Sequence, residues 1–236
     1  MLTFYDYLPS QNAWKVRLLL HHLQRPHRAV RVAIFAGEGR APAFLAINPA
    51  GKVPAIVLAD GRALAESNAI LSFLADGTPY LPAEPFARAK VHQWLCFEQE
   101  HVEPVLGSLR YWTLTGKLAR RDPAFVAGKR AAALRTLALL ERELSARAFI
   151  AGDAYTIADM ALFAYASRAG EAGLPLAPYP QFRAWLGRVQ AQPGFLATVH
   201  PYALDPLAGG ELPGADSFLA EDAAAFPAED AALAAG

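Results

Sequence analysis

The chain has 236 residues, 54% hydrophobic and 19% charged, which allows two domains or one large domain with a sizeable core. Lys plus Arg and Asp plus Glu each number 22, so the formal net charge is zero, and no basic run predicts a nucleic-acid partner. No stretch predicts a membrane span or a signal peptide. Because Cys96 is the single cysteine, an internal disulfide is excluded, and we expect a reduced, cytoplasmic protein.

The first residues predict a strand, a helix and a second strand. Residues 2–7 are rich in aromatic side chains and read as a strand, and residues 8–12 break it. Apolar residues then recur at helical spacing up to Leu23, with Lys15 off the apolar stripe, until Pro26 ends the helix. Residues 27–34 alternate as a second strand. The right-handed crossover rule predicts that the two strands are parallel.

A hairpin and a helix follow. The apolar run 55–58 and the returning run 62–65 flank Asp60-Gly61, the dipeptide that signals a tight antiparallel hairpin. The next residues, Glu66 and Ser67, open an apolar helix, with Ser67 as the predicted N-cap. A helix start with a hydroxyl, free N–H groups and a preceding carboxylate suits a ligand that carries one carboxylate and one ammonium group.

Val53-Pro54 precedes this hairpin. A proline that opens a strand cannot donate to the ladder, and a cis bond would leave the backbone groups of Val53 facing a groove. An extended peptide could then pair with Val53 as a short added strand. The pattern alone is equally compatible with a plain hairpin that begins at a turn proline.

The rest of the chain is predicted to be helical. Residues 77–85 read as a linker, and Pro104 should kink or break the helix that follows. Asp122-Pro123 predicts one helix start, and Thr156 to Asp159 resembles a capping box at another. We therefore divide the chain into residues 1–78, residues 85–202, and an acidic, Ala/Pro/Gly-rich tail, 203–236, that we expect to be poorly ordered.

Four motifs in this order resemble the soluble glutathione S-transferase family over residues 1–200. They are residues 10–16, 48–54, 66–70 and 156–159. The resemblance implies an α/β plus all-α fold, in which a thioredoxin-like N-terminal domain (βαβ-ββα) precedes an all-helical C-terminal domain.

The resemblance also implies a glutathione site. Val53 would precede a cis proline, Pro54, and pair with the cysteinyl backbone of glutathione. Glu66 and Ser67 would hold the γ-glutamyl ammonium and carboxylate, and Lys52 would lie near the glycyl end or the ligand backbone. Glutathione would be a co-substrate, and no metal is predicted.

Catalysis would require activation of the glutathione thiol. A free thiol has a pKa near ~8.5, and lowering it by about two units takes roughly 2.7 kcal/mol of preferential thiolate stabilisation. Ser10 and Asn12, at the start of the first helix, are the two candidate donors, and Ser10 is favoured because it stands where the family's activating residue usually stands. The chain lacks a Cys-x-x-Cys in this loop, so a dithiol mechanism is excluded and glutathione itself must supply the thiol.

The sequence therefore predicts a glutathione S-transferase that adds the thiol to a hydrophobic, electrophilic small molecule. The alternatives are a glutathione-dependent disulfide reductase or peroxidase at the same site, and a non-catalytic interaction module. We expect a homodimer through a face around Trp94, Glu98 and His101. Cys96 is predicted to be packed, and Tyr111 and Trp112 are candidates for lining a hydrophobic co-substrate pocket.

Overall fold

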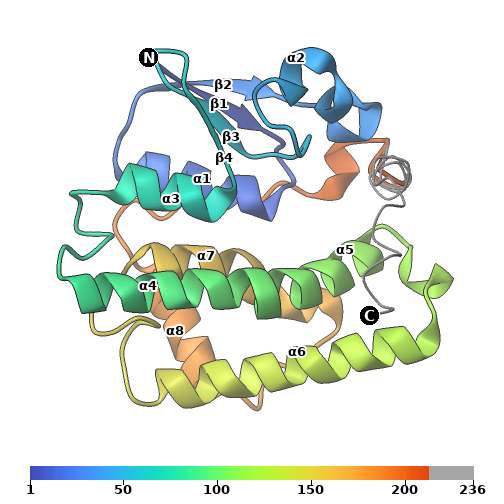
Figure 1. Ribbon diagram of the computed structural model, residues 1–236. Helices are drawn as coiled ribbons and strands as arrows, with labels where there is room; N and C mark the ends of the chain where they lie inside the picture. The colour runs from blue at the N-terminus through green and yellow to red at the C-terminus, as the bar shows by residue number, and fades with distance from the viewer. Residues whose placement is uncertain (213–236) are drawn as a thin grey trace, which may run out of the picture.

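The computed structural model describes residues 1–212 and confirms the predicted fold class. A mixed sheet and its helices form one half of the molecule, and an all-helical half packs against them, with α1 and α3 between the sheet and the helical half (Figure 1). No helix in this described part is long and apolar enough to cross a membrane. The domain limits 1–78 and 85–202 remain predictions.

The N-terminal half follows the predicted βαβ-ββα order. It contains β1 (Leu2–Asp6), α1 (Gln11–His22), β2 (His27–Arg31), β3 (Ala55–Val57), β4 (Ala63–Ala65) and α3 (Ser67–Ala75). The strand order is β2-β1-β3-β4. The strands β1 and β2 are parallel and β3 and β4 are antiparallel, as predicted, and β1 also pairs antiparallel with β3.

The strand β2 is shorter than predicted. It ends at Arg31, and the chain then turns through η1 (Ile34–Ala36), η2 (Glu38–Arg40) and α2 (Pro42–Leu45). The alternating pattern up to Ile34 was misleading, because the Ile34 amide bonds the nearby carbonyl of Val32 at 3.0 Å instead of a neighbouring strand.

The β3–β4 hairpin closes as the Asp60-Gly61 signal predicts. The Leu58 N–H donates to the Arg62 carbonyl at 2.9 Å, and the Gly61 N–H donates to the Leu58 carbonyl at 3.0 Å. Gly61 has φ 88°, which a residue with a side chain rarely adopts. The loop between the paired residues therefore holds one more residue than the two-residue turn that the dipeptide suggests.

The helical half begins with one long helical run. Its parts are α4 (Pro85–Phe97), the π-helical η3 (Glu98–Gly107) and α5 (Ser108–Leu114). Pro104 lies inside η3 and does not break the run, and side chains from α6 bond two backbone carbonyls of this segment. Lys129 donates to the Pro104 carbonyl at 2.6 Å, and Thr136 donates to the His101 carbonyl at 3.1 Å.

The remaining helices are η4 (Leu118–Arg120), α6 (Pro123–Leu144), α7 (Ile157–Ala166), η5 (Ala169–Ala172), α8 (Pro180–Gln190) and η6 (Tyr202–Leu204). The two predicted caps are confirmed: Asp122 accepts the Phe125 N–H, and Thr156 and Asp159 form a capping box at α7. Asp159 is fully buried and also accepts from Ile150 N–H and the Trp185 indole, both at 2.8 Å.

One core joins the two halves. Trp14 of α1 stacks on Phe163 of α7, with ring centroids 5.7 Å apart. The apolar residues of α1 and α3 therefore pack against both the sheet and the helical half. The sheet half has no separate core on this side, so the position of α1 is fixed from both sides.

Residues 203–212 pack onto both halves, which differs from the poor order expected for the tail. The Tyr7 hydroxyl donates to Asp205 at 2.8 Å, Ala208 is buried against Phe35, and the buried Lys117 donates to the Gly210 carbonyl at 2.5 Å. The composition of the segment did not predict these contacts, because they depend on few side chains and on backbone carbonyls. The rest of the expected tail, 213–236, lies outside the described residues.

Candidate functional site

Three segments meet at one end of the sheet because of the strand register. Tyr5 of β1 pairs with Ala55 of β3, which in turn pairs with Ala65 of β4. The segment after β1, the segment before β3 and the segment after β4 must therefore lie side by side. These segments carry all seven predicted site residues: Ser10 and Asn12; Lys52, Val53 and Pro54; Glu66 and Ser67.

The Val53-Pro54 bond is cis, as predicted. The turn before it is held by Asn48, whose side chain donates to the Lys52 carbonyl at 2.6 Å and accepts the Ala50 N–H at 3.1 Å. Val53 is half-buried, whereas the Lys52 side chain is exposed and free to reach a ligand in front of the turn.

The helix α3 begins one residue earlier than predicted, so that Ser67 is its first residue and Glu66 takes the N-cap position without a capping side-chain bond. Glu66 has φ 64° and is exposed, while Ser67 is buried. Ser67 does not cap the helix because it is itself the first helical residue, and its hydroxyl donates to the side-chain carbonyl of Asn12 at 3.2 Å. The first N–H groups of α3 thus have no intrahelical acceptor.

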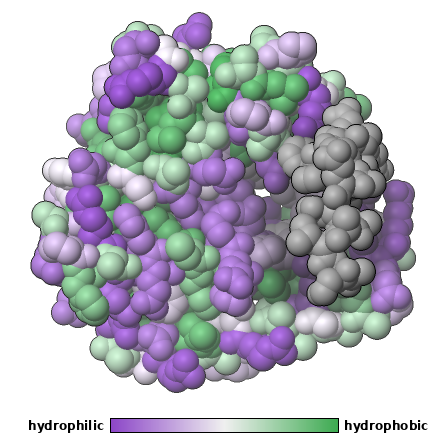
Figure 2. All heavy atoms as spheres, viewed as in Figure 1, coloured by the Kyte–Doolittle hydropathy of each residue, from purple (hydrophilic) through white to green (hydrophobic). Residues whose placement is uncertain are grey.

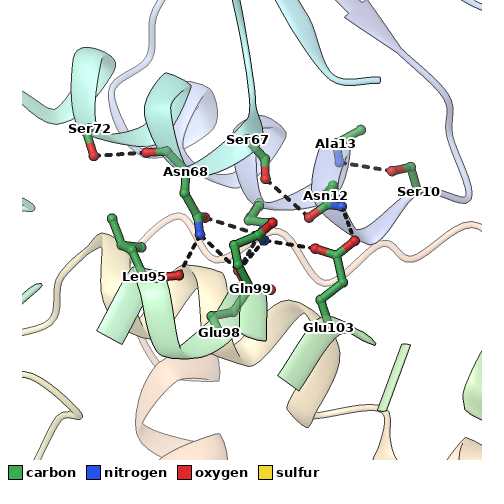
Figure 3. A network of polar contacts seen from close by, with 11 residues as sticks. Ser10, Asn12, Ala13, Ser67, Asn68, Ser72, Leu95, Glu98, Gln99 and Glu103 are labelled. Carbon is green, nitrogen blue, oxygen red and sulfur yellow. Dashed lines mark hydrogen bonds and ion pairs between the residues drawn. The ribbon is translucent and has the colours of Figure 1, made fainter. Parts of the chain in front are cut away.

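The two thiol-activator candidates lie at the start of α1 (Figure 3). Ser10 is the N-cap, and its hydroxyl oxygen accepts the Ala13 N–H at 3.2 Å. The side chain of Asn12 lies between the two halves: its oxygen accepts from Ser67, and its nitrogen donates to Glu103 of η3 at 2.8 Å. Sequence reasoning did not connect Glu103 with this site.

A buried ion pair next to these residues joins α1 to η3. The Lys15 ammonium lies 2.9 Å from Glu98 Oε2, and both side chains are fully buried. Asn68 and Gln99 donate to the same oxygen at 2.9 and 2.7 Å. Glu98 therefore does not lie on an exposed face of this chain, which differs from the dimer face expected around it. Helical spacing placed Lys15 outside the apolar stripe, but its side chain reaches a partner on α4/η3.

Two further predictions about α4 are wrong. Cys96 is exposed instead of packed, because α4 turns its Trp94 side inward. Trp94 and Glu98 are buried in the single chain. Of the three residues predicted to form the dimer face, only His101 is therefore accessible, with 51% of its side chain exposed.

A cleft of about 350 Å³ opens beside Asn12 and Glu103. It is lined by residues of η3, α5, α7 and η6: Gln99, Glu103, Pro104, Gly107, Ser108, Tyr111, Tyr165 and Tyr202. Three phenol rings, a carboxylate and an amide make this lining polar, unlike the hydrophobic pocket that we expected. Figure 2 shows hydrophilic residues gathered across the middle of the face where the two halves meet.

The tyrosines of the cleft are held in the neutral form. Burial, followed by the nearby carboxylates Glu103 and Glu98, raises the pKa of Tyr165 well above its usual value. Tyr111 lines the cleft as expected, whereas Trp112 lies apart from it, against Phe125.

A second cavity of about 210 Å³ lies between the end of β1 and the C-terminal segment. Tyr7, Pro9 and Arg31 line one side of it, and Leu204 and Leu207 line the other. Burial and the bond to Asp205 raise the pKa of Tyr7. Because the Tyr7 hydroxyl is already donated to Asp205, this tyrosine is a poorer thiol donor than Ser10 or Asn12.

Comparisons with known proteins identify relatives over most of the chain. Residues 9–76 match the family described as "Glutathione S-transferase, N-terminal domain", and residues 123–188 match "Glutathione S-transferase, C-terminal domain". Glutathione S-transferase 3 of Zea mays is 33% identical, covering 87% of this chain and 96% of its own. Disulfide-bond oxidoreductase YfcG of Escherichia coli (strain K12) is 30% identical, covering 79% and 89%.

Comparison with solved structures identifies similar proteins of the same family. The crystal structure of a glutathione S-transferase from Pseudomonas fluorescens Pf-5 superimposes with a TM-score of 0.80 at 39% identity, covering 83% of this chain and 97% of that chain. A glutathione transferase family member from the same organism, solved with two glutathione bound, has a TM-score of 0.72 at 29% identity, with coverages of 82% and 89%.

Proposed function

The chain belongs to the glutathione S-transferase family, and from this membership we propose that it binds glutathione, activates the thiol and transfers it to an electrophilic small molecule. The observation that carries the proposal is the meeting of three distant segments at one end of the sheet. The 3.2 Å bond from Ser67 to Asn12 ties the helix start of α3 to that of α1, with Val53 next to both along the sheet edge.

Each part of glutathione has a chemical match in this arrangement. The N–H groups at the start of α3 and the Ser67 hydroxyl suit the γ-glutamyl carboxylate, and the exposed Glu66 suits its ammonium group. The Val53 backbone would pair with the cysteinyl residue as a short added strand. Lys52 would approach the glycyl carboxylate. Four separate contacts would place the sulfur near Ser10 and Asn12.

Two donors are available to stabilise the thiolate. The Ser10 oxygen accepts the Ala13 N–H, which leaves its O–H free to donate. Asn12 uses one of its two N–H bonds on Glu103 and keeps the other. A hydrogen bond to a charged group contributes about 1.5–3 kcal/mol, so one donor and the N-terminus of α1 together would supply the roughly 2.7 kcal/mol that a shift of two pKa units requires.

The enzyme would then act by proximity and thiol activation. The thiolate would attack an electrophilic small molecule held between the two halves of the molecule. We also propose a cytoplasmic homodimer. The exposed Phe73 of α3, with 43% of its surface accessible, is a candidate contact in place of the buried Trp94.

The test begins with glutathione affinity in the wild type and in Ser67→Ala. We expect at least a tenfold weaker affinity in the variant, since it loses a hydroxyl at the carboxylate position. Ser72→Ala on the same helix is the matched control, because Ser72 bonds only the carbonyl of Asn68 in its own helix. A wild type that does not bind glutathione, or a Ser67→Ala variant that binds as tightly as the control, would contradict the proposal.

Thiol activation is tested by the pH dependence of the ultraviolet absorbance of the bound thiolate in Ser10→Ala and Asn12→Ala. We expect the variant that lacks the true donor to show a raised thiol pKa and roughly a hundredfold lower turnover, with nearly unchanged glutathione affinity. A thiol pKa that rises in only one variant assigns the donor. If the thiol pKa is the same as in the wild type in both variants, activation of the thiol by either side chain is ruled out.

A second candidate is glutathione-dependent disulfide reduction at the same site. It is favoured by the polar lining of the cleft, which suits a peptide-like substrate, and by the similarity to an oxidoreductase and to a structure with two glutathione bound. The glutathione thiolate would attack a mixed disulfide and release the second thiol. Turnover of mixed disulfides, hydroperoxides and electrophiles, measured side by side, distinguishes these activities. Absence of turnover with intact glutathione binding would favour the non-catalytic module.

A further inference from the structure

Glu103 connects the helical half to the start of α1. It belongs to η3, and its two oxygens point to different neighbours: Oε1 accepts from Asn12 Nδ2 at 2.8 Å, and Oε2 accepts from Gln99 Nε2 at 2.8 Å (Figure 3). Glu103 thus accepts hydrogen bonds from two side-chain amides, one of which belongs to a candidate thiol activator.

This contact fixes the direction in which the Asn12 amide points. An ionised carboxylate only accepts hydrogen bonds, so the amide atom that faces Glu103 must be the nitrogen. At the other end of the amide, the Ser67 hydroxyl donates to Asn12 Oδ1 at 3.2 Å. With the amide reversed, its oxygen would face a carboxylate and its nitrogen would face a hydroxyl. Only the observed direction satisfies both neighbours.

The direction matters because only the nitrogen can donate to a thiolate. Nδ2 carries two hydrogens, and Glu103 takes one of them. The other is left for a sulfur atom at the start of α1. A freely rotating amide would present its oxygen for part of the time, and an oxygen would repel the thiolate.

We propose that Glu103 is a positioning residue that holds the Asn12 amide with its nitrogen toward the thiol of bound glutathione. This inference rests on the proposed function, because it requires glutathione at the site. Glu103 itself does not touch the thiol in this role. It acts through Asn12, and Gln99 keeps its carboxylate in place.

Because Glu103 is charged, the inference can be tested by the direction in which the thiol pKa changes in a variant that lacks this charge. A carboxylate near a thiolate disfavours the thiolate, so removal of the charge alone would lower the pKa of the thiol. Loss of positioning would instead raise it. The other groups around Glu103 are Glu98 beside it on η3, paired with Lys15 of α1, and the neutral Tyr165 and Tyr202. None of them is altered in Glu103→Gln, which keeps the size of the side chain.

The experiment measures the pKa of glutathione bound to the wild type, Glu103→Gln, Asn12→Ala and the double variant, by thiolate absorbance. We expect Glu103→Gln to raise the thiol pKa by about one, equivalent to weakening one net hydrogen bond, and to leave glutathione affinity within about twofold. In the Asn12→Ala background the same change should cause no further rise. Glu100→Gln is the control for charge, because Glu100 is on the same helix and its side chain is 78% exposed.

A lowered or unchanged thiol pKa in Glu103→Gln would overturn the inference, and so would an equal rise in the presence and absence of Asn12. If Asn12→Ala leaves the thiol pKa unchanged while glutathione still binds, Asn12 is not the donor; the inference then fails and the proposed function stands on Ser10. If the wild type does not bind glutathione, the proposed function fails and the inference fails with it. Thermal melting of each variant separates these outcomes from unfolding.

Discussion

Replacement of Lys15 by methionine is expected to destabilise the protein strongly, because it leaves Glu98 buried without its cation. The ion pair spans 2.9 Å with both side chains fully buried. After the change, Glu98 Oε2 would keep only the neutral donors Asn68 and Gln99, and Oε1 has no hydrogen-bond partner. Removal of one partner of such a pair costs about 3–5 kcal/mol in the free energy of unfolding.

A second expectation concerns the removal of both charges of the ion pair. Replacement of both charges, in Lys15→Met with Glu98→Leu, removes the uncompensated charge and should cost less than Lys15→Met alone. At about 2–4 °C per kcal/mol for a chain of this size, the single variant should melt roughly 6–20 °C below the wild type. Urea denaturation and calorimetry measure these values. A single variant within 1 °C of the wild type, or a double variant whose loss equals the sum of the two single losses, would refute the reasoning.

The control is an ion pair on the surface. Arg62 and Asp60 form a contact of 2.8 Å, but their side chains are 75% and 53% exposed. Such pairs contribute little to stability, because solvent screens them. We therefore expect Arg62→Met to leave the melting temperature unchanged. An equally large effect at both sites would show that charge loss in general, and not burial, causes the destabilisation.

Three further predictions concern other contacts. Burial raises the pKa of Asp159 from 3.8 to about 6. Stability from this group is therefore fully present below pH 3.8 and lost as pH rises through 6. In calorimetry, the advantage of the wild type over Asp159→Asn should shrink by about 2.4 kcal/mol from pH 4 to 7, and a constant difference would contradict this. A Cβ on Gly107 would lie 2.8 Å from Cε1 of Tyr165, so Gly107→Ala should narrow the cleft and raise KM for the second substrate; an unchanged KM would show that the ring moves freely. Truncation after Tyr202 should lower the melting temperature relative to truncation after Leu212, because only the longer chain keeps the contacts of residues 203–212; equal melting temperatures would disprove a stabilising role.

The sequence by itself determined the features that depend on near neighbours in the chain. The capping box from Thr156 to Asp159, the N-cap Asp122 and the turn at Asp60-Gly61 act within a few residues, so their patterns are readable without a fold. The order of the elements and the family motifs followed from the same local signals. The site residues Ser10, Asn12, Val53 and Ser67 were found in this way, although their roles remain proposals.

Only the tertiary structure decided the partners of the polar groups. Helical spacing placed Lys15 off the apolar stripe, yet its long side chain reaches Glu98, which is 83 residues away in the chain. The contact of Asn12 with Glu103 spans 91 residues and depends on how η3 packs against α1. No pattern within one helix encodes such a contact, because it exists only once the two halves are packed together. The polar lining of the cleft and the packing of residues 203–212 were hidden for the same reason: each is assembled from segments that become neighbours only in the folded chain.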